Sequence, residues 1–300
     1  MRDAIASFSE WRKLQVKEST VTGYDRDLRY LCVYLGNPLV TEITLDRIME
    51  YLNGLADNGW DRNTLIPKTI AMRRFFDFLA RQGYDVLDKE LIPIPEKKYR
   101  LPRVLSEATF RTLLGTIPPR SRDPRHIRNE AIVRLLWDTG ARNGEILSIN
   151  VGDVDTETRS AIIRTEKSKG RRPFRQIFWT PETNGAVERW MRKREHLARL
   201  MPAIDPSALF ISVAGSVHRT SGRRFTIRGV GEMLRRYSVR AEIPHVNAHS
   251  FRHRKGHQII HEGGSATDVM NILGHSCVQS TSIYTMMTGA ELRQRADRFL

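Results

Sequence analysis

A proline-rich stretch about one third of the way along the chain constrains the fold most. Residues 91–104 read LIPIPEKKYRLPRV and hold three prolines. Proline lacks a backbone N–H and cannot continue a helix, so no regular helix is expected to run through this stretch. A linker is therefore predicted at residues 91–104, between a first domain over residues 1–90 and a second over residues 105–300.

Three stretches of the first domain repeat their apolar residues with a helical period. The first stretch places Tyr24, Leu28, Leu31 and Leu35 on one helical face. Ser19 or Thr20 is expected to cap this helix, and Gly36 to end it. The second helix is expected to begin after Thr44. The third stretch, residues 63–84, is predicted as one helix or as a split one, which makes the domain a small helical bundle.

The second domain mixes helical periods with one β-rich segment. SAIIRT and RQIFWT, within residues 160–180, are typical of the two strands of a hairpin, and the basic run between them is typical of its tip. Helices are predicted at about residues 106–116, 127–138, 182–200, 226–241, 249–262, 266–273 and 289–299. The expected fold class is mainly α with a small β-sheet or hairpin (α+β).

The charge of the chain is strongly positive and unevenly distributed. The net charge is +15 and the pI about 10.2. Residues 1–100 carry +1 and residues 101–300 carry +14. Such an excess is typical of a protein that binds a polyanion, nucleic acid first, although a generally basic soluble surface is the plainer interpretation.

Cysteine usage and hydropathy indicate the compartment. Cys32 and Cys277 lie far apart and form no metal-type pair, which favours a reducing interior. The first residues, MRDAIASFSEWRK, lack the apolar run of a signal peptide. No stretch approaches the ~20 apolar residues of a membrane span. We expect a cytoplasmic, nucleoid-associated protein with no membrane contact.

A glycine and an arginine meet where a predicted helix ends. In DTGARNGEI, residues 138–146, Gly140 breaks the helix and Arg142 follows in the turn before a new one. A turn can hold a planar guanidinium where it binds two phosphate oxygens. Glu145, three residues on, is expected to orient that guanidinium. The plainer interpretation is a surface ion pair, which contributes little.

Cations also gather on the hairpin tip and in the linker. A hairpin tip can enter a DNA groove, and one lysine there can protonate a leaving oxygen. The cations predicted to contact DNA are Lys167, Arg171 and Arg172 at the tip and Lys97, Lys98 and Arg100 in the linker. A solvated basic turn and a solvated linker are the alternatives.

The densest basic stretch is NAHSFRHRKGHQIIHEGG, residues 247–264. His249 and Arg252 are three residues apart, so on a helix they share a face and can point at one phosphate. Histidines recur there every four residues, at His245, His249, His253, His257 and His261. Histidine pairs at this spacing can bind zinc. No HExxH or CxxC accompanies them and the interleaved cations would repel a metal, so no metal is expected. Structural roles remain the alternative for the last three histidines.

A tyrosine follows a glycine-histidine pair in LGHSCVQSTSIYT, residues 273–285. A phenol with a pKa near 10 is a poor nucleophile unless cations surround it. The plainer interpretations are that His275 packs a turn and that Tyr284 is half-buried. The basic motifs described above supply cations, so Tyr284 is a candidate nucleophile.

Taken in order, these motifs resemble those of the tyrosine recombinases, the family of phage integrases and Xer-type site-specific recombinases. The ordered set is TGAR with a glutamate three residues on, a basic hairpin tip, HSFRH, and LGH with a tyrosine nine residues later. The resemblance covers nearly the whole chain, including the LPRVLSEATF stretch that leads into the second domain. It implies an N-terminal helical, SAM-like core-binding domain that clamps DNA and a C-terminal catalytic domain.

The resemblance also implies a role for each motif residue. It assigns catalytic roles to Arg142, Lys169, His249, Arg252, His275 and Tyr284, with Tyr284 as the nucleophile and Glu145 in support. Lys169 fits the family distance to the following strand, and Lys167 is the alternative because the hairpin is about one residue longer than usual. Arg254 and Lys255 stand where the family normally has a small hydroxyl residue, which is expected to alter only local DNA contacts.

The activity that the resemblance implies is cleavage and rejoining of DNA through a covalent 3′-phosphotyrosine, with strand exchange through a Holliday junction. It needs no metal, ATP or other cofactor. The implied partner is double-stranded DNA with specific recombination sites. Exchange between two duplexes implies a homotetramer, docked through a C-terminal helix at residues 289–299 unless that helix packs on its own domain. An accessory protein or partner recombinase is left open. The alternatives are a catalytically silent DNA-binding protein and a DNA-relaxing enzyme of topoisomerase IB type.

Overall fold

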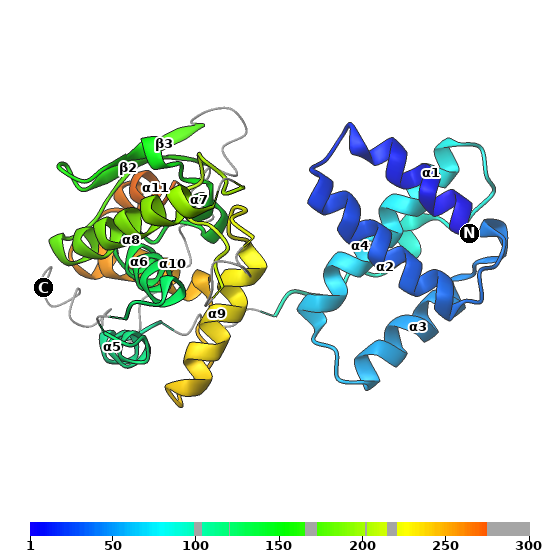
Figure 1. Ribbon diagram of the computed structural model, residues 1–300. Helices are drawn as coiled ribbons and strands as arrows, with labels where there is room; N and C mark the ends of the chain where they lie inside the picture. Colours follow the sequence, from blue (N-terminus) through cyan, green and yellow to red (C-terminus); the bar gives the residue numbers. More distant parts are fainter. Residues whose placement is uncertain (99–103, 120, 166–172, 202, 215–220, 275–300) are drawn as a thin grey trace, which may run out of the picture. The chain divides into compact units, whose positions relative to one another are not determined.

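The chain is mainly helical and divides into two compact units. The computed structural model describes residues 1–98, 104–119, 121–165, 173–201, 203–214 and 221–274 (Figure 1). The two units are Met1–Leu101 and Pro102–Leu300. The described residues form eleven α-helices and one three-stranded sheet, which confirms the expected fold class. No helix in this described part of the chain combines the length and apolar character that crossing a membrane requires.

The first unit is a bundle of helices around a core of aromatic and aliphatic side chains. Its helices are α1 (Arg2–Lys13), α2 (Glu18–Tyr34), α3 (Leu45–Asp57) and α4 (Arg62–Arg81). The helix α1 was not predicted as a separate element. Its signal is the spacing of Ile5 and Phe8, three residues apart and both fully buried. Phe8 packs edge-on against Phe75 of α4, with ring centroids 5.7 Å apart.

The helix boundaries follow local capping chemistry. The Thr44 hydroxyl accepts the backbone N–H of Arg47, so this expected cap is confirmed. The expected cap of α2 at Ser19 or Thr20 is wrong, because the helix already begins at Glu18. The Glu18 carboxylate lies in the first turn, where it interacts favourably with the positive end of the helix dipole. The helix α4 continues through Pro67, so the predicted third stretch is one helix and not two.

The chain after α4 stays attached to the first unit. A 3₁₀ turn, Lys89–Leu91, leads into Ile92, which is fully buried in the first core. Arg73 Nε donates to the Ile92 carbonyl at 2.7 Å. Further on, the Asn63 side chain bonds both the backbone N–H and the carbonyl of Lys98, at 3.0 and 2.9 Å. The first half of the proline-rich stretch is thus fastened to α4.

The second unit surrounds a small sheet with helices. Its helices are α5 (Glu107–Gly115), α6 (Pro124–Thr139), α7 (Asn143–Ser148), α8 (Pro181–Leu200), α9 (Ile227–Arg240), α10 (Ala248–His261) and α11 (Ala266–Leu273). The hydroxyl of Ser106 accepts the backbone N–H of Thr109 and caps α5. Each of the predicted helices up to residue 273 is present, and the one predicted at residues 289–299 lies outside the described residues.

The sheet contains the predicted hairpin and one further strand. The strands β1 (Val154–Asp155), β2 (Ser160–Arg164) and β3 (Phe174–Phe178) pair antiparallel in that order. In the hairpin Ser160 faces Phe178 and Arg164 faces Phe174. The strand β1 has only two residues, too few to show an alternation of apolar and polar side chains.

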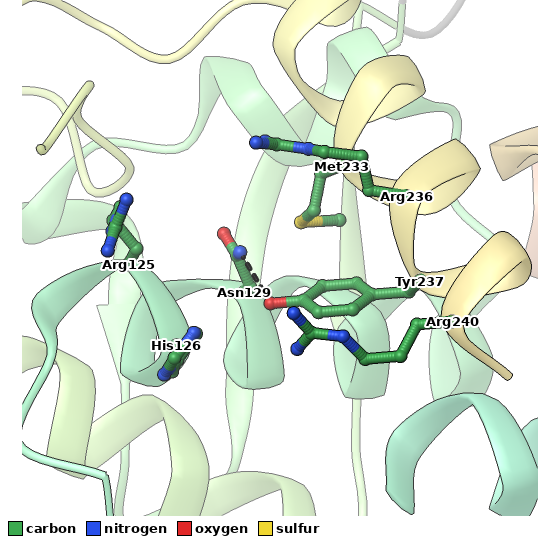
Figure 2. Close-up of a pocket in the computed structure, with 7 residues that line it drawn as sticks. All are labelled: Arg125, His126, Asn129, Met233, Arg236, Tyr237 and Arg240. Carbon is green, nitrogen blue, oxygen red and sulfur yellow. Dashed lines mark hydrogen bonds between the residues drawn. The ribbon is translucent and has the colours of Figure 1, made fainter. Parts of the chain in front are cut away.

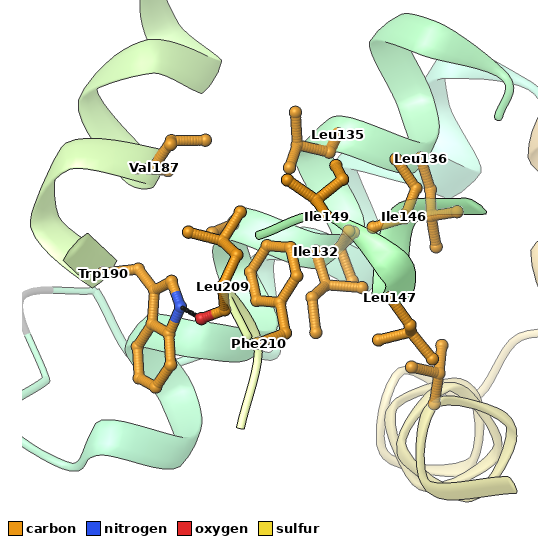
Figure 3. Close-up of a cluster of buried hydrophobic side chains, with 14 of the residues drawn as sticks. Ile132, Leu135, Leu136, Ile146, Leu147, Ile149, Val187, Trp190, Leu209 and Phe210 are labelled. Carbon is orange, nitrogen blue, oxygen red and sulfur yellow. Dashed lines mark hydrogen bonds between the residues drawn. The ribbon is translucent and has the colours of Figure 1, made fainter. Parts of the chain in front are cut away.

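The core of the second unit is organised around α6. This helix buries side chains on several sides and packs against α7, α8, α10 and β3. Figure 3 shows Ile132, Leu135 and Leu136 of α6 among the other core side chains. The indole N–H of Trp190, on α8, donates to the Leu209 carbonyl at 2.8 Å. Because α6 is central, the turn at its C-terminal end has a rigid base.

Candidate active site

The turn between α6 and α7 holds Arg142 at a defined position. Gly140 ends α6 in the left-handed conformation, with φ of 58°. An added Cβ there would lie 2.7 Å from Lys255 Cβ and 2.9 Å from Leu273 Cδ2, so α10 and α11 approach the bare glycine closely. Arg142 then serves as the N-cap residue of α7. Its predicted place in a turn is therefore confirmed.

The Glu145 carboxylate binds both the backbone N–H and the side chain of Arg142. Glu145 Oε2 accepts the Arg142 backbone N–H at 2.9 Å, and Oε1 accepts Arg142 Nη1 at 2.7 Å. Glu145 is fully buried and the Arg142 side chain is 18% exposed, so this is no loose surface pair. The expected orienting contact is present.

A second arginine on the same carboxylate was not predicted. Arg175, on β3, donates from Nη2 to Glu145 Oε2 at 3.0 Å. Burial opposes the charge of Glu145, but Arg175 and Arg142 outweigh it, and the pKa of this carboxyl lies below its usual value. The strand pattern carried a signal, since Arg175 shares a sheet face with the buried Ile177.

Arg252 connects three elements through its guanidinium. It lies on α10 and is 1% exposed. Nη1 donates to the Gly140 carbonyl at 3.2 Å, and Nη2 donates to the Leu273 carbonyl at 2.7 Å. Arg175 Nη1 donates to the neighbouring carbonyl of Ile272 at 2.6 Å. The end of α11, just before His275, is therefore tied to both arginines.

His249 lies one turn before Arg252 but is exposed. Its ring meets that of His253 edge-on, with centroids 4.5 Å apart. Burial, together with His249 and Arg252 nearby, lowers the pKa of His253 to about 4. His253 is thus neutral at pH 7. The two predicted phosphate ligands of α10 differ in exposure, with His249 on the surface and Arg252 inside.

Several predicted site residues lie outside the described part of the chain. These are Arg100 in the linker, Lys167, Lys169, Arg171 and Arg172 on the hairpin tip, and His275 and Tyr284 near the C-terminus. Lys97 and Lys98 are described, and both are exposed. Within the described ranges, no three histidine, cysteine or acidic side chains gather as they would around a metal ion.

The described part of the site has an excess of positive charge. Arg142 and Arg175 both bind the carboxylate of Glu145, and Arg252 donates to the Gly140 carbonyl two residues before Arg142. Such a group of fixed donors at two helix ends suits an anion that carries two negative oxygens, as a phosphodiester does in its transition state.

Comparison with known protein families gives the same assignment over most of the chain. Residues 103–291 match the model of the phage integrase family, and residues 11–83 match that of the phage integrase N-terminal SAM-like domain.

Individual relatives agree with the family models. A tyrosine recombinase XerC of Corynebacterium efficiens is 29% identical over 295 residues, which cover 97% of this chain and 89% of the relative. A tyrosine recombinase XerC of Roseiflexus castenholzii is 30% identical and covers 89% of this chain and 82% of the relative. In fold, the chain is similar to the Tn1549 transposon integrase in complex with a circular intermediate DNA, with a TM-score of 0.72, 19% identity, and coverage of 98% of this chain and 99% of the integrase. The chain belongs to the phage integrase family and is a tyrosine-type site-specific recombinase.

Proposed function

We propose that this recombinase acts through Arg142, Lys169, His249, Arg252, His275 and Tyr284, with Glu145 as a positioning residue. The observation that carries the proposal is the guanidinium of Arg252. It joins the carbonyl of Gly140, two residues before Arg142, to the carbonyl of Leu273, two residues before His275. Motifs far apart in sequence thereby converge on one place.

The proposed reaction is a transesterification on double-stranded DNA. The Tyr284 phenol oxygen attacks a phosphorus atom, forms a bond to the 3′ phosphate and displaces the 5′ oxygen. His249, on the exposed face of α10, takes the phenol proton, and Lys169 protonates the departing oxygen. Arg142, Arg252 and His275 stabilise the charge on the nonbridging oxygens.

The rest of the cycle follows from the covalent intermediate. The phosphotyrosine bond conserves the energy of the broken phosphodiester, so a second 5′ hydroxyl can attack it and reseal the strand. The fixed cations supply the electrostatic stabilisation that a metal ion gives elsewhere. The reaction as proposed therefore draws on no cofactor.

The partners and place of the protein follow from this chemistry. The substrate is double-stranded DNA with specific recombination sites, clamped by residues 1–90 and cut by residues 105–300, with Lys97 and Lys98 of the linker near the backbone. Four protomers, which contact one another through residues 289–299, hold two duplexes. An accessory protein or partner recombinase can take part. The protein works in the cytoplasm at the nucleoid.

A covalent-trapping experiment tests the proposal. The full-length protein is incubated, with chelator present, with nicked suicide duplexes cut from DNA flanking its own gene. Denaturing gels then separate any protein–DNA adduct, and the modified peptide is mapped. We expect an adduct on Tyr284 that is absent in Tyr284→Phe. The matched control is Tyr84→Phe, which removes a phenol from an exposed site in the first unit.

The alternatives give different results. Tight, salt-sensitive binding without an adduct on any member of a randomised site library would indicate a silent DNA-binding protein. Relaxed plasmid circles without recombinants on any pair of sites would indicate topoisomerase-type activity. An adduct that persists in Tyr284→Phe would assign the nucleophile to another residue and reject the proposed site.

A further inference from the structure

A small basic cavity lies between α6 and α9, away from the active site. Its volume is about 190 Å³. Arg125 and His126 line it from the start of α6, and Arg236 and Arg240 line it from the second half of α9 (Figure 2). At 1.5 Å per residue, the start of α6 is roughly 20 Å from the turn after α6 that holds Arg142. Sites for drug-sized ligands are larger, about 300–1,000 Å³, so the cavity suits one small group.

A chain of buried hydrogen bonds ends at this cavity. Tyr237, 6% exposed, accepts a hydrogen bond at its hydroxyl oxygen from Asn129 Nδ2 at 2.9 Å. The Asn129 oxygen in turn accepts Nε and Nη2 of Arg128 at 3.0 and 2.7 Å. Figure 2 draws the bond between Asn129 and Tyr237.

These contacts determine what the hydroxyl can do. The Asn129 oxygen faces a cation, so its NH₂ group must face the phenol. Because the Tyr237 oxygen accepts that bond, its own O–H is left to donate elsewhere. Among the described residues no acceptor takes this hydrogen. A buried donor is therefore aimed at a cavity that basic side chains surround.

The cations around the cavity exceed the carboxylates that neutralise them. Arg125 is paired with Asp123 at 2.6 Å. Arg236 comes within only 4.0 Å of Glu232, and that carboxylate already binds Arg235 at 2.8 Å.

Arg240, the third arginine of the lining, bonds to a neutral group in the described part of the chain, as does Arg128, which belongs to the hydrogen-bond chain and does not line the cavity. Arg240 donates weakly to the Thr116 carbonyl at 3.5 Å, and Arg128 donates to the Ile211 carbonyl at 3.0 Å. Arg128 is 4% exposed, and burial lowers its pKa to about 9. Arg125, Arg236 and Arg240, which line the cavity, are exposed and only partly neutralised, and an anion in the cavity would give their guanidiniums a common partner.

We propose that this cavity binds a single phosphate group, with the Tyr237 hydroxyl and the Arg236 and Arg240 guanidiniums as donors. Guanidinium forks match the oxygens of a phosphate, and a neutral phenol adds a donor that needs no counter-charge. The phosphate is that of the free anion or of a phosphodiester in bound DNA, since both offer the same nonbridging oxygens. The site is independent of the catalytic residues proposed above.

The test uses the full-length protein and inorganic phosphate, titrated by calorimetry at constant ionic strength with chloride as the reference anion. Arg240→Gln removes one guanidinium and Tyr237→Phe removes only the hydroxyl. Arg235→Gln is the matched control, because it removes the same charge from the same helix outside the cavity. Saturable phosphate binding is expected in the wild type and in the control, with at least tenfold weaker binding in both cavity variants.

A second arm identifies the source of the phosphate. Affinity for a mixed-sequence duplex is measured against salt concentration for the same variants. If a DNA phosphate occupies the cavity, Arg240→Gln should weaken DNA binding more than Arg235→Gln does. The slope of log affinity against log salt concentration should also be smaller in Arg240→Gln, by about one unit more than in Arg235→Gln. If the cavity binds a free anion, Arg240→Gln and Arg235→Gln should have equal affinity for DNA. Only Arg240→Gln should then lose phosphate binding. Equal behaviour of the two variants in both arms overturns the proposal. If the wild-type protein forms no covalent adduct on Tyr284 in the trapping experiment, the catalytic proposal is rejected. The phosphate site is still decided by the two arms described here.

Discussion

Arg252 Nη2 donates to the carbonyl oxygen of Leu273 at 2.7 Å, across 21 residues of sequence. Its other terminal nitrogen donates to Gly140, and Arg175 ties the preceding carbonyl of α11 to Glu145. Glu145 binds Arg142, which closes a ring of hydrogen bonds around the site. Each cation in this ring is held by a buried partner, so its position does not depend on DNA being present.

Replacing Arg252 with lysine is expected to slow DNA cleavage. An ammonium on a flexible stem cannot donate to both carbonyls and to a phosphate in a fixed plane. The rate of adduct formation on a suicide duplex should fall roughly 10²–10³-fold, as for the loss of a preorganised donor. Arg254→Lys, two residues along the same helix, is the control, since Arg254 stacks on Trp137 at 3.8 Å. Similar rates in both variants would contradict the assigned role of Arg252.

Replacing Arg175 with glutamine is expected to destabilise the second unit. The Arg175 side chain is 10% exposed and its partner Glu145 is fully buried, so the variant leaves a buried carboxylate with one cation in place of two. The free energy of unfolding in urea should fall by about 3 kcal/mol. Arg189→Gln breaks a half-exposed pair with Glu130 and should cost less than about 1 kcal/mol. A loss for Arg175→Gln as small as that of the control would show that the buried pair is not stabilising.

Alanine at Gly274 is expected to disturb both the backbone and Arg175. Gly274 has φ of 68°, and an added Cβ would lie 2.8 Å from Arg175 Nε. The backbone alone should cost about 1–2 kcal/mol. Gly263→Ala provides the comparison, because Gly263 also has positive φ but open space around it. Thermal unfolding should show a larger loss for Gly274→Ala, and an equal loss would mean that the contact with Arg175 costs nothing.

The half-buried ring of His253 predicts a pH dependence of stability. Its pKa is about 4 in the folded chain and 6.5 as the ordinary value. Between these values the unfolded chain binds a proton that the folded chain does not, so stability should fall as pH falls from 6.5 to 4. His253→Gln should flatten this part of the profile. His245→Gln, in the exposed loop before α10, is the control for the loss of a histidine side chain. An unchanged slope in His253→Gln would assign the loss to other groups.

The local features of this protein were predictable from its sequence. Thr44 and Ser106 cap helices because their hydroxyls reach backbone N–H groups a few residues on, and such contacts need no partner from elsewhere. Gly140 ends α6 where a left-handed residue was needed. The pair of Arg142 and Glu145 was predictable for the same reason, because the two residues are three positions apart at the start of one helix. The predicted start of α2 was wrong, because the helix already begins at Glu18, after Lys17, which caps it without a side-chain hydrogen bond.

Residue patterns alone predict the order of the motifs, the described helices and hairpin strands, and the family to which the chain belongs. The packing of these elements is what brings Arg175 to Glu145, lets Arg252 span the ends of α6 and α11, and places the buried Tyr237 hydroxyl at a basic cavity. The physical reason is that these contacts join residues 21 to 112 positions apart, often through backbone carbonyls that every residue has. No residue pattern marks such an acceptor, and only the packing of the helices selects it.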